Sequence, residues 1–230
     1  MTTPALGRFR LSLLTLAAAV LTLSTGSTAR AQVWNEVGDA GSLVQTAQVT
    51  VGSGPLLTIL GNLASPTDVD VYCIHYEYTP PGAAMGARAL SAGPPPGLPL
   101  IQLQCAGTQD PNVWLFDAAG NGVLSGSTCA AGNKTIFTPA VPLTPGTYYV
   151  AVSYYGYDPQ SALGPIWLPG GPTSRAPDGP GAPASLVGWA GTPILGPLSP
   201  YQLNLTYMSY CSAPVPTVRT TWGTLKSIYR

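Results

Sequence analysis

The stretch Asp68-Val-Asp-Val-Tyr-Cys-Ile-His-Tyr-Glu-Tyr78 decides the fold class, because its apolar side chains recur at every second position. In an extended strand, successive side chains point to opposite faces of the sheet. The two faces of this segment then hold Val69, Val71 and Cys73 on one side and Tyr72, Ile74 and Tyr76 on the other. Since both sets are apolar or aromatic, we expect a strand that is at least partly covered on both faces.

Several other segments carry the same alternation or are rich in β-branched and aromatic residues, which favours strands. Asn121-Gly122 separates two of them and suits the left-handed conformations of a hairpin turn. In residues 201–207, Tyr and Leu at odd positions alternate with polar residues, as in an antiparallel sheet with one face in water. The other segments expected to form strands are 45–51, 56–60, 98–104, 112–117, 122–127, 135–137 and 147–154.

The composition fits short strands joined by many turns. The chain has 230 residues, of which 27 are glycine and 25 proline, and these show no collagen-like period of three. Hydrophobic residues make up 45% of the chain, enough for a sizeable core, and charged residues only 8%, too few for a disordered polyelectrolyte. We therefore expect an all-β protein whose main part, residues 32–211, is one antiparallel β-sandwich.

A targeting segment precedes this part. Arg8 and Arg10 stand before the apolar run 11–23, and Ala29-Arg30-Ala31 follows it, which is the pattern of a secretory signal peptide over residues 1–31. The alternative, an uncleaved membrane anchor, is disfavoured because about 13 apolar residues fall short of the about 20 that span a bilayer. We expect an exported protein that is secreted, extracellular or at the cell surface, with the periplasm as a further location.

The charge of the exported part argues against nucleic-acid partners. Without residues 1–31 the chain has six basic residues against nine acidic ones, a net charge of −3. Three of the cations, Arg219, Lys226 and Arg230, fall in the last twelve residues, so the part up to Cys211 carries −6. Proteins that bind nucleic acids neutralise phosphates with basic surfaces. We expect no nucleic-acid partner, and no membrane span after signal cleavage.

The four cysteines, Cys73, Cys105, Cys129 and Cys211, all lie in the exported part. Exported proteins mature in oxidising compartments, where an even number of cysteines favours disulfides. Zinc is disfavoured because no two cysteines have the spacing of a zinc site and His75 is the only histidine. Three pairings are open, and we favour Cys105 with Cys129 and Cys73 with Cys211.

Two long segments rich in proline and glycine, residues 80–99 and 164–200, interrupt the expected strands. Loops of this length are either functional surface loops or disordered insertions, and both interpretations are open here. Residues 212–230 begin with a proline-containing linker and end in a basic amphipathic tail. The near-helical spacing of Trp222, Leu225 and Ile228 leads us to interpret this tail as a sorting or docking tag, with a frayed terminus as the alternative.

Five short motifs follow one another in order along the chain. They are Trp34-Asn-Glu-Val-Gly-Asp-Ala-Gly41, Asp68-Val-Asp-Val-Tyr72, Trp114-Leu-Phe-Asp-Ala-Ala-Gly-Asn-Gly122, Pro145-Gly-Thr-Tyr-Tyr149 and Tyr201-Gln-Leu-Asn-Leu205. Over about residues 33–210 the chain resembles the bacterial pre-peptidase C-terminal (PPC-type) domain superfamily, and more closely the exported, mostly uncharacterised bacterial proteins built on that domain. The resemblance implies a jelly-roll-like β-sandwich that accompanies secreted enzymes or stands alone, and is not itself catalytic. The four cysteines and residues 80–99 depart from that pattern.

The residues offer no convincing catalytic site. A Ser-His or Cys-His nucleophile needs a histidine as base, and His75 lies in the middle of an expected strand. Glycoside hydrolysis needs two facing carboxylates, but Asp39, Asp110, Asp117 and Asp158 stand at turn-like positions where a short carboxylate caps the backbone. We expect a non-enzymatic structural, adhesive or accessory binding module. A carboxylate-based secreted hydrolase with a loop-lined cleft is the alternative.

Calcium is the one candidate cofactor. It takes hard oxygen ligands, and the candidates in this chain are Glu36, Asp39, Asp68 and Asp70. Asp68 and Asp70 fall on one face of the expected strand, and the segment 36–39 could come alongside. No EF-hand spacing is present, so the other interpretation is that these acids cap turns and keep the protein soluble.

Aromatic side chains are candidates for binding a polysaccharide, a peptide or a component of the cell surface, because their ring faces can stack on a ligand. The best placed ones lie at or beyond the end of the expected strand 147–154, where loops carry function. They are Tyr155, Tyr157, Trp167 and Trp189. Packing in the core is the default interpretation for each of them.

Overall fold

The computed structural model describes residues 32–78, 99–104, 111–126, 133–137, 143–170, 174–193 and 200–212. Over these ranges the protein is all-β, and its one helical element is the 3-10 turn η1 (Val44–Thr46). No helix in the described ranges has the length and apolarity to cross a membrane. Several expected features lie outside them, namely the signal peptide, Cys105, Asp110, Cys129, residues 79–98 and the tail beyond Ser212.

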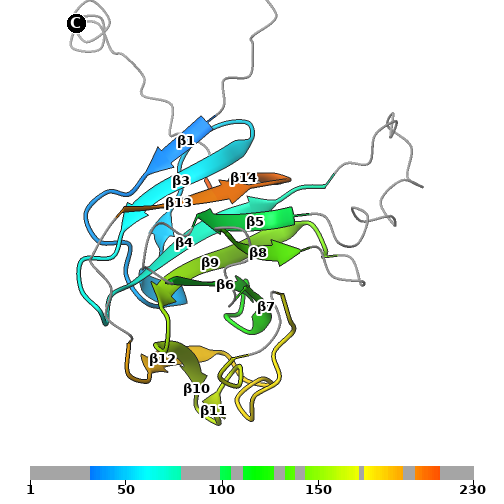
Figure 1. Cartoon of the computed structure of the whole chain (residues 1–230). Coiled ribbons are helices and arrows are strands. Elements are labelled where there is room, and N and C mark those ends of the chain that lie inside the picture. Colours follow the sequence, from blue (N-terminus) through cyan, green and yellow to red (C-terminus); the bar gives the residue numbers. More distant parts are fainter. Residues whose placement is uncertain are drawn as a thin grey trace, which may run out of the picture.

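Two sheets form the body of the fold (Figure 1). The five-stranded sheet has the order β1 (Gln32–Asn35), β3 (Leu56–Asn62), β13 (Pro200–Leu205), β5 (Pro99–Gln104) and β8 (Asn133–Phe137). The six-stranded sheet has the order β14 (Met208–Tyr210), β4 (Val69–Tyr76), β9 (Gly146–Tyr154), β6 (Pro111–Asp117) and β7 (Gly122–Gly126), with β2 (Gln48–Val49) beside β4. The two sheets pack face to face as a β-sandwich, which confirms the predicted fold class.

The sandwich is not purely antiparallel, and this corrects the expectation. β1 pairs with β3 in parallel and β2 pairs with β4 in parallel, whereas the other strand pairs in the described ranges are antiparallel. The segment 45–51, expected as one strand, is divided between η1 and the short β2. β2 pairs with Tyr72 and Cys73, next to the positions 74–76 that pair with β14. The N-terminal segment thus contributes strands to both sheets.

A third, small sheet lies below β6 and β7 in Figure 1. It consists of β11 (Gly164–Pro165), β10 (Asp158–Ser161) and β12 (Leu186–Ala190) in that order, all antiparallel. Residues 164–200 were expected to be a long loop, and that expectation is wrong because they contain two strands. These strands were not predicted because neither shows a clear alternation. β11 is only two residues long, and Gly188 lies in the middle of β12.

The space between the two large sheets holds the main core. Alternate residues of the long strands point into it, as the period of two predicts. Its buried members include Leu56, Ile59, Tyr72, Ile74, Tyr76, Leu103, Leu115, Val150, Val152, Tyr201, Leu203 and Leu205. Tyr207, expected to face inward, is partly buried and packs against this core. It does so from a turn, because β13 ends at Leu205 and Tyr207, with a φ of +61°, leads the chain into β14.

A second core covers the other face of the six-stranded sheet. Val69 and Val71 of β4, Trp114 and Phe116 of β6 and Ala151 of β9 contribute to it. The small sheet and its loops add the rest, which are Ile166, Trp167 and Leu186. The Trp114 and Trp167 ring centroids lie 5.2 Å apart. Both faces of β4 are therefore buried, which confirms the interpretation of its sequence.

A disulfide ties the end of the described chain to β4. Cys73 and Cys211 are bonded, with their Cα atoms 5.5 Å apart across a sequence separation of 138, which confirms this half of the favoured pairing. The buried Thr50 hydroxyl lies between the same two residues. It donates to the carbonyl oxygen of Cys73 (2.7 Å) and accepts from the N–H of Cys211 (3.0 Å). The segment after β14 is thus fixed covalently and by hydrogen bonds to the six-stranded sheet.

Removing this bridge by the double substitution Cys73→Ala and Cys211→Ala should destabilise the protein. A loop of this length corresponds to about 5 kcal/mol in the chain-entropy model, while measured bridges contribute about 2 to 4 kcal/mol. We expect urea unfolding to show a loss within the measured range. An unfolding midpoint equal to that of the parent protein would contradict a stabilising role for the bridge.

Candidate functional site

The loop between β1 and η1 carries Glu36 and Asp39, and hydrogen bonds from neighbouring side chains fix its conformation. Gln48 of β2 bonds to Val37 twice: its Oε1 accepts from the N–H (3.1 Å) and its Nε2 donates to the carbonyl (2.9 Å). The indole N–H of Trp34 on β1 donates to the same Oε1 (2.8 Å). Residues of both large sheets therefore fix the position of the loop.

The two acids also accept hydrogen bonds from the backbone. Glu36 accepts from the N–H of Ala40 (3.2 Å) and, through its other oxygen, from the N–H of Asn62 at the end of β3 (2.8 Å). Asp39 accepts from the N–H of Gly41 (3.0 Å), the turn-capping role that its sequence position predicts. Gly41 has a φ of +68°, and a Cβ there would overlap Thr46, so only glycine suits this position.

Asp70 approaches this loop from inside the sandwich. It is the second residue of β4 and is fully buried. Its Oδ2 accepts a hydrogen bond from the Tyr201 hydroxyl (2.6 Å), which in turn lies 2.7 Å from the Tyr72 hydroxyl. Since the Tyr201 proton points to Asp70, Tyr72 must donate to Tyr201. This chain of hydroxyl groups satisfies Oδ2, while Oδ1 has no hydrogen-bond partner among the described residues.

Gly61 of β3 leaves the space in which these hydroxyls meet. A Cβ at this position would overlap the hydroxyl groups of both Tyr201 and Tyr72. The two tyrosines come from different sheets, Tyr72 from β4 and Tyr201 from β13. The hydrogen-bonded chain that ends at Asp70 therefore requires a residue as small as glycine at position 61.

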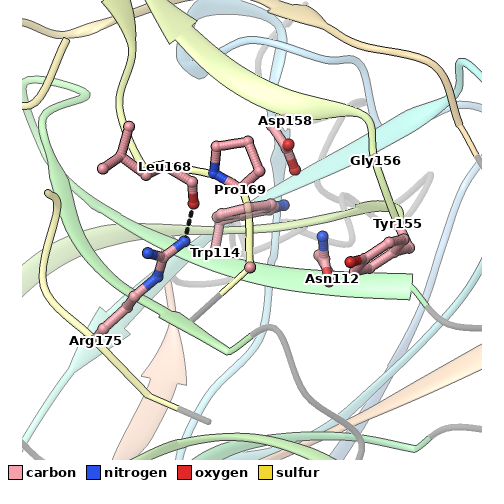
Figure 2. A pocket seen from close by; sticks show the side chains of 9 residues that line it. Asn112, Trp114, Tyr155, Gly156, Asp158, Leu168, Pro169 and Arg175 are labelled. Carbon is pink, nitrogen blue, oxygen red and sulfur yellow. Dashed lines mark hydrogen bonds between the residues drawn. The ribbon is translucent and has the colours of Figure 1, made fainter. Parts of the chain in front are cut away.

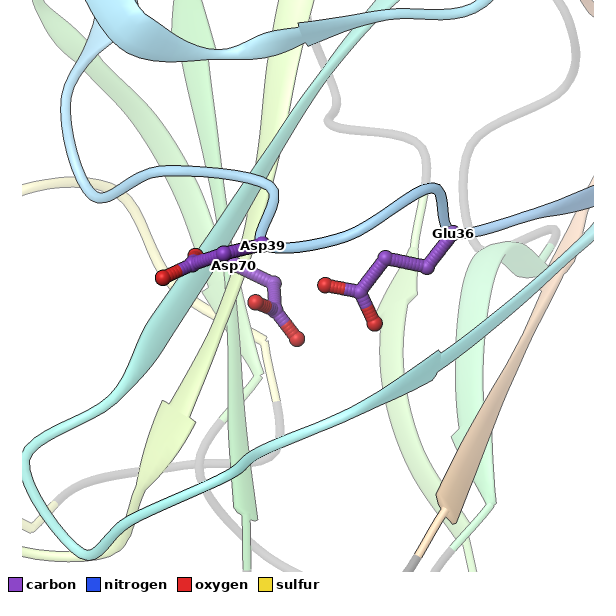
Figure 3. A group of neighbouring side chains, drawn as sticks. All are labelled: Glu36, Asp39 and Asp70. Atoms are coloured by element: carbon purple, nitrogen blue, oxygen red, sulfur yellow. The ribbon is translucent and has the colours of Figure 1, made fainter.

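Glu36, Asp39 and Asp70 form an acidic cluster. Each offers one carboxylate oxygen, and these three oxygens lie within 4.8 Å of one another. Figure 3 shows the carboxylate of Glu36 turned toward that of Asp70. Asp68, the fourth candidate from the sequence, is not in this group, and its carboxylate accepts from the N–H of Ala64 instead. The structure therefore brings together three of the four residues proposed as calcium ligands.

Burial raises the pKa of Asp70 to about 8. The hydrogen bond from Tyr201 works against this shift, whereas the negative charges of Glu36 and Asp68 and a hydrogen bond between protonated Asp70 and Glu36 add to it. Because Oδ2 already accepts from Tyr201, the proton of neutral Asp70 belongs on Oδ1, which in the ionised carboxylate has no hydrogen-bond partner among the described residues. At neutral pH the cluster thus holds either a proton on Asp70 or a positive ion that makes the charged form favourable.

The geometry of the cluster suits a hard cation. Calcium holds its oxygen ligands at about 2.3 to 2.6 Å, so two ligands of one ion lie at most about 5 Å apart. The separation of at most 4.8 Å in the cluster meets this condition. Three carboxylates offer up to six oxygens, and calcium takes further ligands from water and backbone carbonyls.

A separate hollow of about 80 Å³ lies where the turn after β9 meets the loop after β11 (Figure 2). Of the four aromatic residues proposed as binding residues, it includes only Tyr155. Its other side chains come from β6, β10, residues 168–169 and residue 175; they are Asn112, Trp114, Asp158, Leu168, Pro169 and Arg175. Asn112, Leu168 and Arg175 were not singled out from the sequence, because nothing in their local pattern indicates that they meet here.

The other three proposed aromatic residues have structural roles. Trp167 is 1% exposed and packs on Trp114 and Phe116, so it has no ring face to offer to a ligand. The indole N–H of Trp189 donates to the carbonyl of Ser42 (2.7 Å), and the ring packs on Trp114 and Phe116. Tyr157 is partly buried against the second core. The four rings therefore do not form one binding surface.

The remaining candidates from the sequence have local partners. Asp117 accepts from the N–H groups of Ala119 and Asn121 in the β6–β7 hairpin (2.9 Å each), the turn role expected for it. His75 is partly exposed on β4, and its Nε2 lies 3.9 Å from a carboxylate oxygen of Glu77.

No protein-family model matches the sequence, and a comparison with curated proteins found no similar chain.

The raised pKa of Asp70 predicts how stability depends on pH in the absence of divalent cations. Between about pH 4 and pH 8 the unfolded chain ionises Asp70 while the folded chain keeps it protonated, so stability falls as the pH rises, by at most about 1.4 kcal/mol per pH unit. Asp70→Asn should remove this component and flatten the profile. Urea unfolding in chelator at several pH values measures it. A parent protein whose stability rises over this range through Asp70 would contradict the assignment.

Trp167→Ala tests the structural role of the buried ring. Removal of a buried tryptophan leaves a cavity in the second core and should cost about 3 to 5 kcal/mol. Leu163→Ala is the matched control, because Leu163 is 60% exposed and its truncation should change stability by no more than about 0.5 kcal/mol. Similar unfolding midpoints for the two variants would argue against burial of Trp167.

Proposed function

We propose that this protein is a non-catalytic, exported β-sandwich that serves as a structural or accessory binding module, stabilised by a calcium ion at Glu36, Asp39 and Asp70. Two observations carry the proposal. In its ionised form Asp70 has a buried Oδ1 with no hydrogen-bond partner among the described residues, and one carboxylate oxygen of Asp70 lies within 4.8 Å of one oxygen of Glu36 and one of Asp39. An unpaired polar atom in a protein interior is costly. A bound cation would pair it.

Three features of the loop support a cation rather than a proton alone. The loop is tied to both sheets through Trp34 and Gln48, so it keeps its acids in place without an ion to organise them. The two acids on it, Glu36 and Asp39, already use some oxygen lone pairs on backbone N–H groups, which orients the others. Three carboxylates this close repel one another, and a divalent ion relieves this repulsion more fully than one proton.

The proposed location and family have their own support. A disulfide between Cys73 and Cys211 is compatible with maturation in an oxidising compartment. The β-sandwich agrees with the architecture implied by the resemblance to the PPC-type superfamily. Three of the four acids in its first two motifs meet in space, namely Glu36, Asp39 and Asp70. We therefore propose membership of that superfamily for this chain.

The hydrolase alternative has less support from the geometry. Glycoside hydrolysis uses two carboxylates that both reach the substrate. In the acidic cluster Asp70 is fully buried, and the hollow described above has a single carboxylate, Asp158, among its described side chains. Screening of the purified protein for hydrolysis of polysaccharides tests this alternative directly.

Calcium should raise the thermal stability of the protein. An ion at 100 times its dissociation constant stabilises the folded state by about 2.7 kcal/mol, which shifts the midpoint by several degrees in a chain of this size. Binding must expel the proton from Asp70, so we expect the shift to weaken as the pH falls from 8 to 5. Calorimetric scans with calcium chloride, magnesium chloride and chelator measure these effects.

Asp39→Asn is the informative variant for this experiment. Asn keeps an oxygen for the N–H of Gly41 but loses the charge, so the fold should persist while the calcium shift drops. Glu77→Gln removes an exposed charge outside the cluster and should leave the shift intact. A midpoint that calcium and chelator leave unchanged in the parent protein would refute the proposed ion.

A further inference from the structure

We propose that residues 213–230 dock on the protein's own six-stranded sheet, on the part of its outer face that lies beyond the second core. This interaction goes beyond the proposed function and does not depend on the proposed ion. The surface carries Val49, Val51, Tyr149 and Glu77, none of which belongs to the acidic cluster. The partner of the C-terminal tail is then the sheet from which the tail departs.

The strand register puts the side chains of this surface on one face. Val49 of β2 is the partner of Cys73 on β4, and Cys73 is in turn the partner of Tyr149 on β9. Side chains two residues apart along a strand point to the same side. Cys73 and His75 therefore share the face of Val71, which belongs to the second core. The surface is thus the continuation of the face that the second core covers.

Apolar side chains are exposed on this surface. Val71 and Ala151 are fully buried under the second core, whereas Tyr149, one step further along β9, is only partly buried against it. At the edge of the sheet, Val49 is 48% exposed and Val51 is 40% exposed. Exposed apolar side chains beside a core favour the packing of a further apolar segment.

The C-terminal tail departs from the edge of this surface. The disulfide of Cys211 ties the chain to β4, and Ser212 then pairs in parallel with Val51. The N–H of Ser212 donates to the carbonyl of Thr50 (3.1 Å), and its carbonyl accepts from the N–H of Gly52 (3.0 Å). Residue 213 therefore starts beside the exposed valines. A segment tethered at this point has a high effective concentration for the neighbouring surface.

The tail has the length and the apolar residues to reach and cover this surface. Trp222 follows Ser212 by ten residues, a stretch that can span about 33 Å. Neighbouring strands lie about 4.8 Å apart, so every strand of the six-stranded sheet is within reach. Leu225 and Ile228 follow Trp222 at near-helical spacing. A helix this short is marginal alone in water, so its apolar side needs a surface of this kind.

The charges favour the tail over a second copy of the protein. Residues 213–230 have no acid and three cations, namely Arg219, Lys226 and Arg230. Residues 32–211 carry a net charge of −6, so a second copy would bring a like charge. At the end of the surface stands Glu77, which is 61% exposed and lies 3.9 Å from the Nε2 of His75. Exposed ion pairs contribute little free energy, so the charges orient the tail and the apolar contacts hold it.

Hydrogen exchange of the purified protein, followed by mass spectrometry, tests the docked tail. We expect the amides of residues 222–230 to exchange at least about tenfold more slowly than in a synthetic peptide of the same sequence. Val49→Asp places a charge in the apolar contact and should remove this protection. Glu77→Lys repels the basic tail and should reduce it. Because the contact lies within one chain, the protection should not change with protein concentration.

Val187→Asp is the matched control, since Val187 is 56% exposed on β12 of the small sheet, and the tail should stay protected in this variant. Leu225→Ser weakens the same contact from the tail and leaves the sheet unaltered, so it decides the matter if Val49→Asp fails to fold. The proposal is overturned if the tail of the parent protein exchanges as fast as the peptide, or if both Val49→Asp and Leu225→Ser keep the protection. Protection that appears only at high protein concentration would indicate a second copy and also overturn it. The calcium shift of the parent protein is measured separately, so it can persist when the docked tail is refuted.

Discussion

The burial of β4 on both faces is the constraint on which the rest of the structure depends. One face of this strand supplies Tyr72, Ile74 and Tyr76 to the main core, and the other supplies Val69 and Val71 to the second core. A strand of this kind has no face left for water, so the sheet needs a layer on each side. The five-stranded sheet provides one layer, and the small sheet with its loops provides the other.

The same constraint explains why Asp70 matters. It is an acid in a strand that exposes neither face, and a buried carboxylate is tolerated only when it is neutralised or paired. Tyr201 of the five-stranded sheet donates to its Oδ2, and Tyr72 of the six-stranded sheet bonds to Tyr201. Glu36 and Asp39 each bring one carboxylate oxygen within 4.8 Å of one of its oxygens. The protonation or ligation of one side chain is thereby coupled to the contact between the sheets and the N-terminal segment.

The second core supports one side of the hollow that Trp114 and Arg175 line. Trp114 packs against Trp167 and Trp189, so its ring is already immobile where it reaches the hollow. Arg175 comes from a segment that extends the edge of β7, and Asp178 holds its guanidinium. The aromatic residues that stand out in the sequence are therefore mostly packed in this core, and several of the side chains that line the hollow are polar.

The amino-acid sequence was sufficient to predict the strands with clear alternation, the two covered faces of β4 and the pairing of Cys73 with Cys211 as the favoured choice. It also placed the three acids that meet among its four candidates. These depend on local periodicity and residue chemistry, which the chain carries wherever it folds. The folded structure was needed to reveal the parallel pairing of β1 with β3 and of β2 with β4, and the two strands within residues 164–200. It also revealed the burial of Trp167 and the place of Asp158 and Arg175 in one hollow. Those features join residues far apart in the sequence, and short strands rich in glycine and proline leave no periodic signal from which their partners could be read.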